Sequence, residues 1–344
     1  MEKIVPAVEL RRLGRYENAS DPLGFSMSGV GMQAACTRVD VEISCAYGSH
    51  SPWMGVLVDG APVGRFSLKQ GTHWYQAIGG MDAQFPHQIA IVRDSQPVPE
   101  DASSQFITIE RVCVDGEMQP APKPSMIVEF AGDSLTSGEG TVGPGSALEW
   151  RMAYMSAMNT YAQLLCCQLG AEGRWISQSG WGIHAAWDGD ETRCIPLIYD
   201  QVCATDEAGR KPYDFAREPA DWIVINLGTN DVNPVRFYTD LEQADREEAH
   251  FVREYKAFIR MIRELNGPET RIVCALGPMD YYLFDNIRTA VEAYRQETGD
   301  TLVYALKLIG INLMTEGFGA VGHPSAKTHA RVGQELAARL RKIL

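Results

Sequence analysis

Long hydrophobic runs are missing from this sequence, and their absence narrows what the protein can be. No apolar run approaches the ~20 residues that a membrane-spanning helix needs. The first residues, MEKIVPAVELRRLGRY, lack the uninterrupted apolar segment of a secretory signal. We therefore expect no membrane partner and a cytoplasmic location.

Positive charge is also scarce. The 31 Lys and Arg residues are outnumbered by 44 Asp and Glu residues, which gives a formal net charge of −13, and no Lys/Arg cluster offsets this locally. A chain of this charge repels phosphate backbones and anionic membrane surfaces. We therefore expect no nucleic-acid partner.

Cysteine patterns that bind metals are absent as well. The eight cysteines include no CxxC pair and no Cys/His cluster at ligand spacing. The adjacent Cys166 and Cys167 lie in an apolar stretch with a helical pattern, so buried free thiols are expected, in agreement with a reducing compartment. The sequence indicates neither a metal nor another cofactor, and it indicates no oligomeric state.

The first 120 residues or so consist of short alternating segments, such as TRVDVEISCAY and HQIAIVRD, separated by turn residues. Alternation with frequent turns is typical of an antiparallel sandwich, and VLVDGAPV places Asp-Gly between two strand-like runs, which favours a hairpin. The three prolines of MQPAPKPS (118–125) then hold the chain extended. At 344 residues the chain is long enough for two domains, which we predict at 1–122 and 123–344.

The second domain has a different pattern. The runs MIVEFAG, RWISQSG, DWIVINLG and TRIVCALG are continuously apolar, as strands covered on both faces must be. Between and after them lie three helical patterns: AYMSAMNTYAQLLCCQLG, REEAHFVREYKAFIRMIRELNG and SAKTHARVGQELAARLRKIL. This alternation predicts an α/β fold with a doubly wound parallel sheet, whose site lies at the carboxyl ends of the strands.

Four short motifs of small and polar residues mark this domain. Three follow predicted strands and one opens the last helix: GDSL (132–135), SGWG (179–182), GTND (228–231) and GHPS (322–325). Because the carboxyl ends of parallel strands share one edge of a sheet, residues far apart in sequence converge there. We therefore expect Ser134, Gly180, Asn230 and His323 to surround one reacting carbonyl.

These residue types suit acyl transfer. Serine needs a base to remove its proton at neutral pH, and the unperturbed pKa of histidine suits that task. The backbone N–H groups of Ser134 and Gly180 and the side-chain amide of Asn230 can supply the donors that a tetrahedral oxyanion requires. Asp133 and Asp231 stand beside turns, where a carboxylate more often accepts from backbone N–H groups, so we assign both to structure.

The four motifs, in this order and spacing, resemble the SGNH (GDSL-type) hydrolase family, which has a flavodoxin-like α/β/α fold. A β-sandwich ahead of such a domain resembles family two of the carbohydrate esterases, in which a jelly-roll precedes the catalytic domain. The resemblance implies Ser134 and His323 as catalytic residues that need no metal. It also implies an enzyme that removes O-acetyl groups from plant-type oligosaccharides, such as xylan or mannan fragments, through an acyl-enzyme.

One departure from the family pattern concerns the group that orients the histidine. Family members commonly carry an aspartate two or three residues before it, where this chain has Val321 and Ala320. Either a backbone carbonyl accepts from Nδ1 of His323, or a carboxylate from elsewhere takes the place of the aspartate. Glu316 is the nearest acidic residue before the histidine. We favour the carbonyl.

Other interpretations remain open at this point. Trp181 forms either a wall of the substrate pocket or a hydrophobic plug between the domains. An alternative function is that of a lipolytic esterase or thioesterase of the same superfamily, which needs an extended apolar groove. A further alternative is a carbohydrate-binding protein whose hydrolase domain is vestigial.

Overall fold

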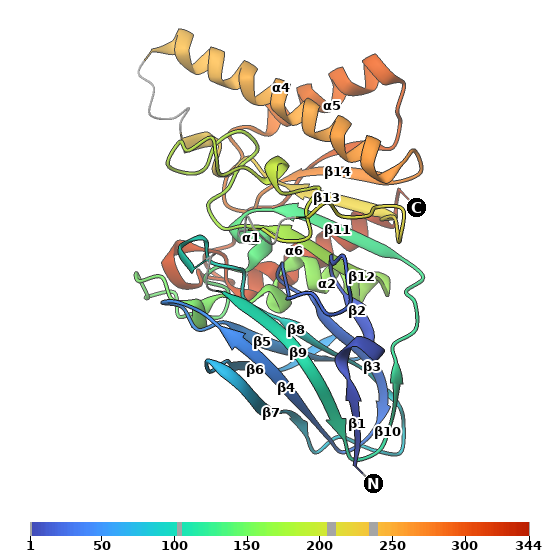
Figure 1. Ribbon diagram of the computed structural model, residues 1–344. Coiled ribbons are helices and arrows are strands. Elements are labelled where there is room, and N and C mark those ends of the chain that lie inside the picture. The colour runs from blue at the N-terminus through green and yellow to red at the C-terminus, as the bar shows by residue number, and fades with distance from the viewer. Residues whose placement is uncertain (1, 102–104, 205–210, 234–239, 344) are drawn as a thin grey trace.

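The computed structural model describes residues 2–101, 105–204, 211–233 and 240–343. Its two antiparallel sheets belong to the N-terminal half of the chain and pack as two layers. The parallel sheet, with its helices, lies against them (Figure 1). Within the described ranges, no helix combines the length and hydropathy that crossing a bilayer requires.

Two antiparallel sheets make up the N-terminal half. The first has the order β1 (Lys3–Pro6), β9 (Phe106–Val114), β4 (Arg38–Ala46), β7 (Gly71–Gly79). The second has the order β10 (Glu117–Pro120), β3 (Gly29–Ala35), β8 (His87–Arg93), β5 (Trp53–Val58), β6 (Ala61–Ser67), with β2 (Arg11–Leu13) paired to β3. Both sheets contribute to one hydrophobic cluster, so they face each other as the predicted sandwich.

The alternation in the sequence matches this arrangement. In β4 the side chains of Val39, Val41 and Ile43 are fully buried, while the residues between them point outward. The predicted hairpin joins β5 to β6 through Asp59 and Gly60, with φ of +51° and +81°, the left-handed conformation that a tight hairpin turn needs.

The C-terminal half contains the predicted parallel sheet. Its strand order is β12 (Glu172–Ser177), β11 (Ile127–Gly132), β13 (Trp222–Asn226), β14 (Arg271–Leu276), β15 (Val303–Lys307), and each neighbouring pair is parallel. The order reverses at β11, the first strand of this sheet in the chain. A crevice therefore opens beside the carboxyl end of β11, as it does in other doubly wound sheets.

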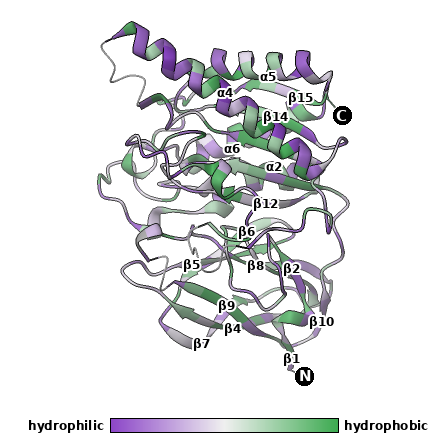
Figure 2. Ribbon diagram, turned by 45° about the horizontal axis from the view of Figure 1, so that its top comes forward, coloured by the Kyte–Doolittle hydropathy of each residue, from purple (hydrophilic) through white to green (hydrophobic). Residues whose placement is uncertain are grey.

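Helices cover both faces of this sheet. The α-helices are α1 (Ser134–Ser137), α2 (Tyr161–Leu169), α4 (Leu241–Asn266), α5 (Phe284–Thr298) and α6 (Ala326–Leu340). Ile223 and Ile225 of β13 pack with α4 and α5, whereas Trp222 and Val224 pack with α2 and α6. Strands covered on both sides are continuously hydrophobic, whereas α4 and α5 alternate between hydrophilic and hydrophobic residues along their length (Figure 2).

Three elements differ from the sequence prediction. The helix expected from residue 153 begins at Tyr161 and follows two 3-10 turns, Met152–Tyr154 and Ala157–Asn159. The physical reason is a contact with the sandwich, because the backbone N–H groups of Ala157 and Met158 donate to Asp94 rather than to a preceding helical turn. Strand β15 and helix α5 were not predicted at all.

The cysteines are free thiols throughout, as expected. Cys166 is buried, but the expectation of burial is wrong for Cys167, which is exposed. The two residues are consecutive on α2, so they point to different sides of the helix. Sγ of Cys167 donates to the carbonyl of Gly60 in the β5–β6 turn at 2.9 Å.

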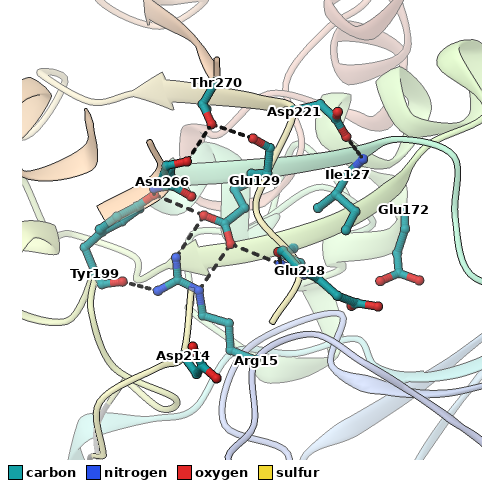
Figure 3. Close-up of polar contacts among 12 residues, drawn as sticks. Arg15, Ile127, Glu129, Glu172, Tyr199, Asp214, Glu218, Asp221, Asn266 and Thr270 are labelled. Carbon is teal, nitrogen blue, oxygen red and sulfur yellow. Dashed lines mark hydrogen bonds and ion pairs between the residues drawn. The ribbon is translucent and has the colours of Figure 1, made fainter. Parts of the chain in front are cut away.

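A buried ion pair joins the two halves. Arg15, just after β2, donates to Glu129 of β11, with 2.9 Å between Nη2 and Oε2 and side chains 1% exposed (Figure 3). Arg15 also donates to the carbonyl of Tyr199, whose hydroxyl donates to Glu129. The boundary predicted at 122/123 falls between β10 and β11, and contacts such as these cross it.

Candidate active site

Ser134 is the first residue of α1, directly after β11. The side chain of Asp133 caps this short helix by accepting from the N–H of Leu135 at 2.9 Å. Ser134 is 6% exposed, and its Oγ lies 2.9 Å from Nε2 of His323. The structure thus brings together the predicted nucleophile and the predicted base, which are 189 residues apart in the chain.

His323 reaches the serine because two loops pack closely. It lies between a 3-10 turn, Ala320–Gly322, and helix α6. The N–H of Ala320 donates to the carbonyl of Gly140 at 2.9 Å. A Cβ on Gly140 would lie 2.3 Å from the carbonyl oxygen of Ala320 and 3.0 Å from Cβ of His323, so a side chain there would push the histidine loop away. No sequence motif indicates this role of Gly140.

The other ring nitrogen of His323 faces the backbone. Nδ1 lies 3.3 Å from the carbonyl oxygen of Val321 and 3.9 Å from Oε1 of Glu139. Glu316 contacts Arg331, Thr328 and the N–H of Asn312 instead. The geometry therefore agrees with the carbonyl that the sequence analysis favoured, while Glu139 is a nearby carboxylate that it missed.

The expected oxyanion donors lie at the same end of the sheet. Ser134, Gly180 and Asn230 all line the cleft that holds His323. Among the described residues, the N–H groups of Ser134 and Gly180 have no hydrogen-bond acceptor, so they are available to a ligand. The amide nitrogen of Asn230 donates to the carbonyl of Trp181 at 2.9 Å, which fixes the side chain. The same nitrogen also donates to Oδ2 of Asp133 at 3.5 Å, a long contact that an oxyanion in the cleft would replace.

Glycine is required at position 180 for two reasons. Its φ is +80°, and a Cβ there would lie 2.8 Å from Cδ1 of Trp187. The carbonyl of Gly180 accepts from the N–H of Trp187 at 2.9 Å, so the two residues approach each other closely. Gly182, the other candidate in the motif, is packed against Ala185 and Asp231 and does not line the cleft.

The aspartates of the GDSL and GTND motifs, Asp133 and Asp231, accept hydrogen bonds from backbone N–H groups, as predicted. Asp231 accepts from the N–H groups of Ile183 and His184, and it is fully buried. Burial raises the pKa of Asp133 to about 7, and the negative charge of Asp231 acts in the same direction, against the hydrogen bond from Leu135. Asp133 is therefore a capping group that titrates near neutral pH.

A cleft of about 600 Å³ opens above these residues, and both halves of the chain line it. The N-terminal half contributes His50, and its ring contacts Trp150 edge-on with 5.0 Å between centroids. Trp187 also lines the cleft and is 56% exposed. Trp181 reaches the cleft but is 4% exposed and belongs to the hydrophobic core, so its role as a pocket wall stays a prediction.

The indoles of Trp150 and Trp187 and the ring of His50 were not predicted from the sequence to line the cleft. Trp150 and Trp187 lie in loops at 142–150 and 184–196, and neither loop carries a motif. Their only signal is a tryptophan in a loop, which occurs in many proteins.

Comparisons with known proteins agree with this geometry. A family model described as the GDSL-like Lipase/Acylhydrolase family matches residues 130–331. The cellulase/esterase CelE of Acetivibrio thermocellus is 28% identical over 338 residues, which make up 96% of this chain and 39% of that protein. The chain therefore spans about two fifths of the length of CelE. An acetylxylan esterase / glucomannan deacetylase of Cellvibrio japonicus is 24% identical, covering 96% of this chain and 88% of that protein.

Solved structures extend the likeness over both halves. The acetyl xylan esterase Est2A from Butyrivibrio proteoclasticus superposes with a TM-score of 0.90 at 26% identity, covering 99% of this chain and 98% of that one. A family two carbohydrate esterase from Clostridium thermocellum, solved with cellohexaose, superposes with a TM-score of 0.78 at 25% identity, covering 99% and 98%. The resemblance predicted from the motifs is thus confirmed along the whole chain.

Proposed function

The chain belongs to the GDSL-like lipase/acylhydrolase family, and from this we infer that it is a serine esterase that removes O-acetyl groups from plant-type oligosaccharides. The observation that carries the proposal is the 2.9 Å contact between Oγ of Ser134 and Nε2 of His323 at the floor of an open cleft. The relatives are esterases, and one of them was solved with an oligosaccharide, cellohexaose.

The geometry suits a two-step reaction. His323 removes the proton of Ser134 while Oγ attacks the acetyl carbonyl, and the N–H groups of Ser134, Gly180 and Asn230 hold the oxyanion. His323 then donates that proton to the departing oxygen of the sugar, which leaves as a hydroxyl. In the second step His323 accepts a proton from water, which attacks the acyl-enzyme, and returns the proton to Oγ of Ser134 as acetate leaves.

The cleft is shaped for a polar ligand. Polar side chains that line it, besides the reacting groups, include Gln96, Glu139, Arg193, Asn233 and Asp280. Trp150 and Trp187 add aromatic faces, on which sugar rings stack well. This mixture favours acetylated oligosaccharides, with xylan or mannan fragments as the first substrates to test, over a long acyl chain.

Acetate release from an acetylated xylo- or manno-oligosaccharide tests the proposal, with 4-nitrophenyl acetate as a second substrate. We expect the wild type to act on both and Ser134→Ala to act on neither. Ser137→Ala is the matched control, because Ser137 lies on the same helix but donates to Ser177 instead of facing His323. Activity that survives Ser134→Ala would reject the proposed nucleophile.

A lipolytic esterase or thioesterase is the second candidate from the sequence. Chain length separates it from the first: we expect the rate on 4-nitrophenyl esters to fall sharply beyond acetate. A rate that rises with acyl length would favour the lipolytic function.

The third candidate is a carbohydrate-binding protein without activity. The pairing of Ser134 with His323 argues against it, since a decayed site has no reason to keep this contact. Binding of the acetylated oligosaccharide by calorimetry, together with no acetate release, would favour it.

We also propose a cytoplasmic location, with imported oligosaccharide fragments as substrates. The free thiols support a reducing compartment. Fractionation of the source cells tests this: recovery of the protein outside the cytoplasm would reject it.

A further inference from the structure

Two histidines and a glutamate from separate parts of the chain meet outside the catalytic cleft. His184 lies in the loop after β12, whereas Glu247 and His250 lie on helix α4. One side-chain ligand atom of each, a ring nitrogen or a carboxylate oxygen, lies within 4.8 Å of the other two. Nε2 of His184 is 3.9 Å from Oε2 of Glu247. Neither the family motifs nor the proposed reaction uses these three residues.

Buried neighbours fix the position of His184. Its side chain is 4% exposed, and its backbone N–H donates to Oδ1 of Asp231 at 2.9 Å. The same carboxylate oxygen lies 3.0 Å from Nδ1 of the ring, which leaves Nε2 directed to α4. A carboxylate on one ring nitrogen with the other nitrogen free to coordinate is the usual arrangement of a histidine that binds a metal.

Helix α4 presents the other two groups on one face. Glu247 and His250 are three residues apart, and residues at this spacing are neighbours on a helix surface. The same Glu-x-x-His spacing supplies metal ligands inside helix bundles. Their side chains are 28% and 35% exposed, so they can rotate, whereas His184 is held in place.

We propose that His184, Glu247 and His250 bind a divalent transition-metal ion of the zinc type. Two imidazole nitrogens and one carboxylate oxygen suit zinc and its neighbours, whereas calcium and magnesium prefer oxygen ligands alone. Tetrahedral ligands about 2.1 Å from an ion are about 3.4 Å apart, so ligand atoms that lie up to 4.8 Å apart must approach each other by up to about 1.4 Å on binding. Rotation of Glu247 and His250 supplies that contraction.

The local charge also favours a cation. Asp231 contacts His184, and Glu254 lies one turn along α4 with Oε1 3.5 Å from Nε2 of His250. Two carboxylates thus stand beside the three ligands. Negative charge next to the three ligands stabilises a dication bound between them.

The alternative is a simple packing of rings and ion pairs. The rings of His184 and His250 have centroids 5.0 Å apart and an interplanar angle of 53°, and Phe251 lies beside them with a centroid 6.0 Å from that of His184. Rings in this arrangement hold together without an ion. This alternative predicts no affinity for metals beyond that of the exposed thiol of Cys167.

A bound ion would tie α4 to the loop after β12, which carries the expected oxyanion donor Gly180. Asp231 follows Asn230 directly and holds the N–H groups of Ile183 and His184. An ion on His184 therefore joins three segments next to Asn230, although it touches no reacting atom. The unfolded chain does not assemble this site, so the ion binds only the folded protein and stabilises it. At ion concentrations above Kd, the melting temperature should therefore rise with the logarithm of the ion concentration.

Zinc and cobalt binding to the metal-stripped full-length protein tests the proposal. We expect calorimetry to give one zinc site per chain, and cobalt to give intense visible bands of a four- or five-coordinate site without a thiolate charge-transfer band. His250→Gln and Glu247→Gln should each weaken zinc binding by at least about a hundredfold, since loss of an outer-shell partner alone costs 10- to 100-fold. Both should also abolish the zinc-dependent rise in melting temperature.

Three control variants test whether zinc binds at another histidine, carboxylate or thiol instead. His73→Gln removes an exposed histidine of β7, Glu248→Gln removes the neighbouring carboxylate on α4, which contacts Asn286, and Cys167→Ser removes the exposed thiol. We expect all three to bind zinc like the wild type. Equal binding by the wild type and His250→Gln, a cobalt–thiolate band, or no binding at all would overturn the proposal.

Discussion

The carbonyl oxygen of Val321 lies 3.3 Å from Nδ1 of His323, so a backbone group two residues before the histidine faces the nitrogen that an aspartate was expected to contact. Val321 adopts φ of +49°, a left-handed conformation that is unusual for a β-branched residue. Its N–H donates to the carbonyl of Ala147 at 2.8 Å, which helps to hold this conformation. The orientation of the base thus depends on a backbone turn.

Glu139→Gln tests whether the carbonyl suffices. Oε1 of Glu139 is 3.9 Å from Nδ1 of His323, beyond hydrogen-bond distance. We expect kcat on 4-nitrophenyl acetate to fall by less than about tenfold, because Val321 still accepts from the ring. A fall of about 10⁴-fold, as seen when the acid of a triad is neutralised, would assign the orienting role to Glu139.

Glu316→Gln should separate stability from activity. The guanidinium of Arg331 holds the pKa of Glu316 below its ordinary value, and Thr328 also donates to this carboxylate. We expect kcat to stay within about twofold, while the free energy of unfolding in urea falls by about 1–3 kcal/mol, the usual loss when a partner of a charged hydrogen bond is removed. A fall in kcat of about 10³-fold or more would give Glu316 a role in orienting His323.

Gly180→Ala should damage the oxyanion site. A side chain at φ of +80° is strained, and its Cβ would meet Cδ1 of Trp187 at 2.8 Å. We expect kcat to fall by about 10²- to 10³-fold, the loss that follows removal of one oxyanion donor. The control is Gly189→Ala, which has φ of +86° but no heavy atom within 4 Å of its Cβ. That variant should lose about 1–2 kcal/mol of stability with unchanged kcat, and equal kcat values for the two variants would contradict the prediction.

Asp133→Asn should change the pH dependence of stability. Asp133 ionises near pH 7 in the folded protein and near pH 4 in the unfolded chain, so between these values the folded state keeps a proton that the unfolded state has lost. Its contribution to stability therefore falls as pH rises from about 4 to about 7, by up to about 1.4 kcal/mol per pH unit. The variant still accepts from Leu135, so its free energy of unfolding should depend less steeply on pH in this range. Parallel curves for the variant and the wild type would contradict this.

Arg15→Met should destabilise the protein strongly. The substitution leaves the buried carboxylate of Glu129 without its closest cation, and breaking a buried pair from one side typically costs about 3–5 kcal/mol. Adding Glu129→Gln removes the unpaired charge and should restore at least about half of the loss. Arg38→Met is the control, because Arg38 pairs with Glu2 at the surface and such pairs contribute at most about 1 kcal/mol. Urea unfolding measures all three, and equal losses for Arg15→Met and Arg38→Met would contradict the prediction.

The sequence predicts best where local pattern and global fold agree. The buried strands β11, β13 and β14 have continuous apolar runs, and Ser134 follows one of them in a recognisable motif. Strand β15 was missed because its residues, VYALK, are partly exposed at the sheet edge and form neither a continuous run nor a strict alternation. The partial exposure of β15 results from its position at the edge of the sheet. A local stretch of sequence does not show where in the sheet a strand will lie.

The residues of the cleft also fall into two groups, those that the sequence predicts and those that it does not. Ser134 and His323 lie in motifs, so the contact between them could be predicted. His50 and Trp150 meet only because a loop of the sandwich packs beside a loop of the second half, and Glu139 reaches the base because Gly140 permits a close approach. These are tertiary contacts between segments without motifs, and no periodicity or spacing indicates them.

The pairing of Arg15 with Glu129 also sets an order of events during synthesis. A ribosome makes the chain from its N-terminus, so the guanidinium emerges 114 residues before its carboxylate and 184 residues before the Tyr199 carbonyl that it also contacts. Until then the guanidinium lacks both of these partners. The contacts of Arg15 that join the two halves can therefore be complete only after Tyr199 has been made.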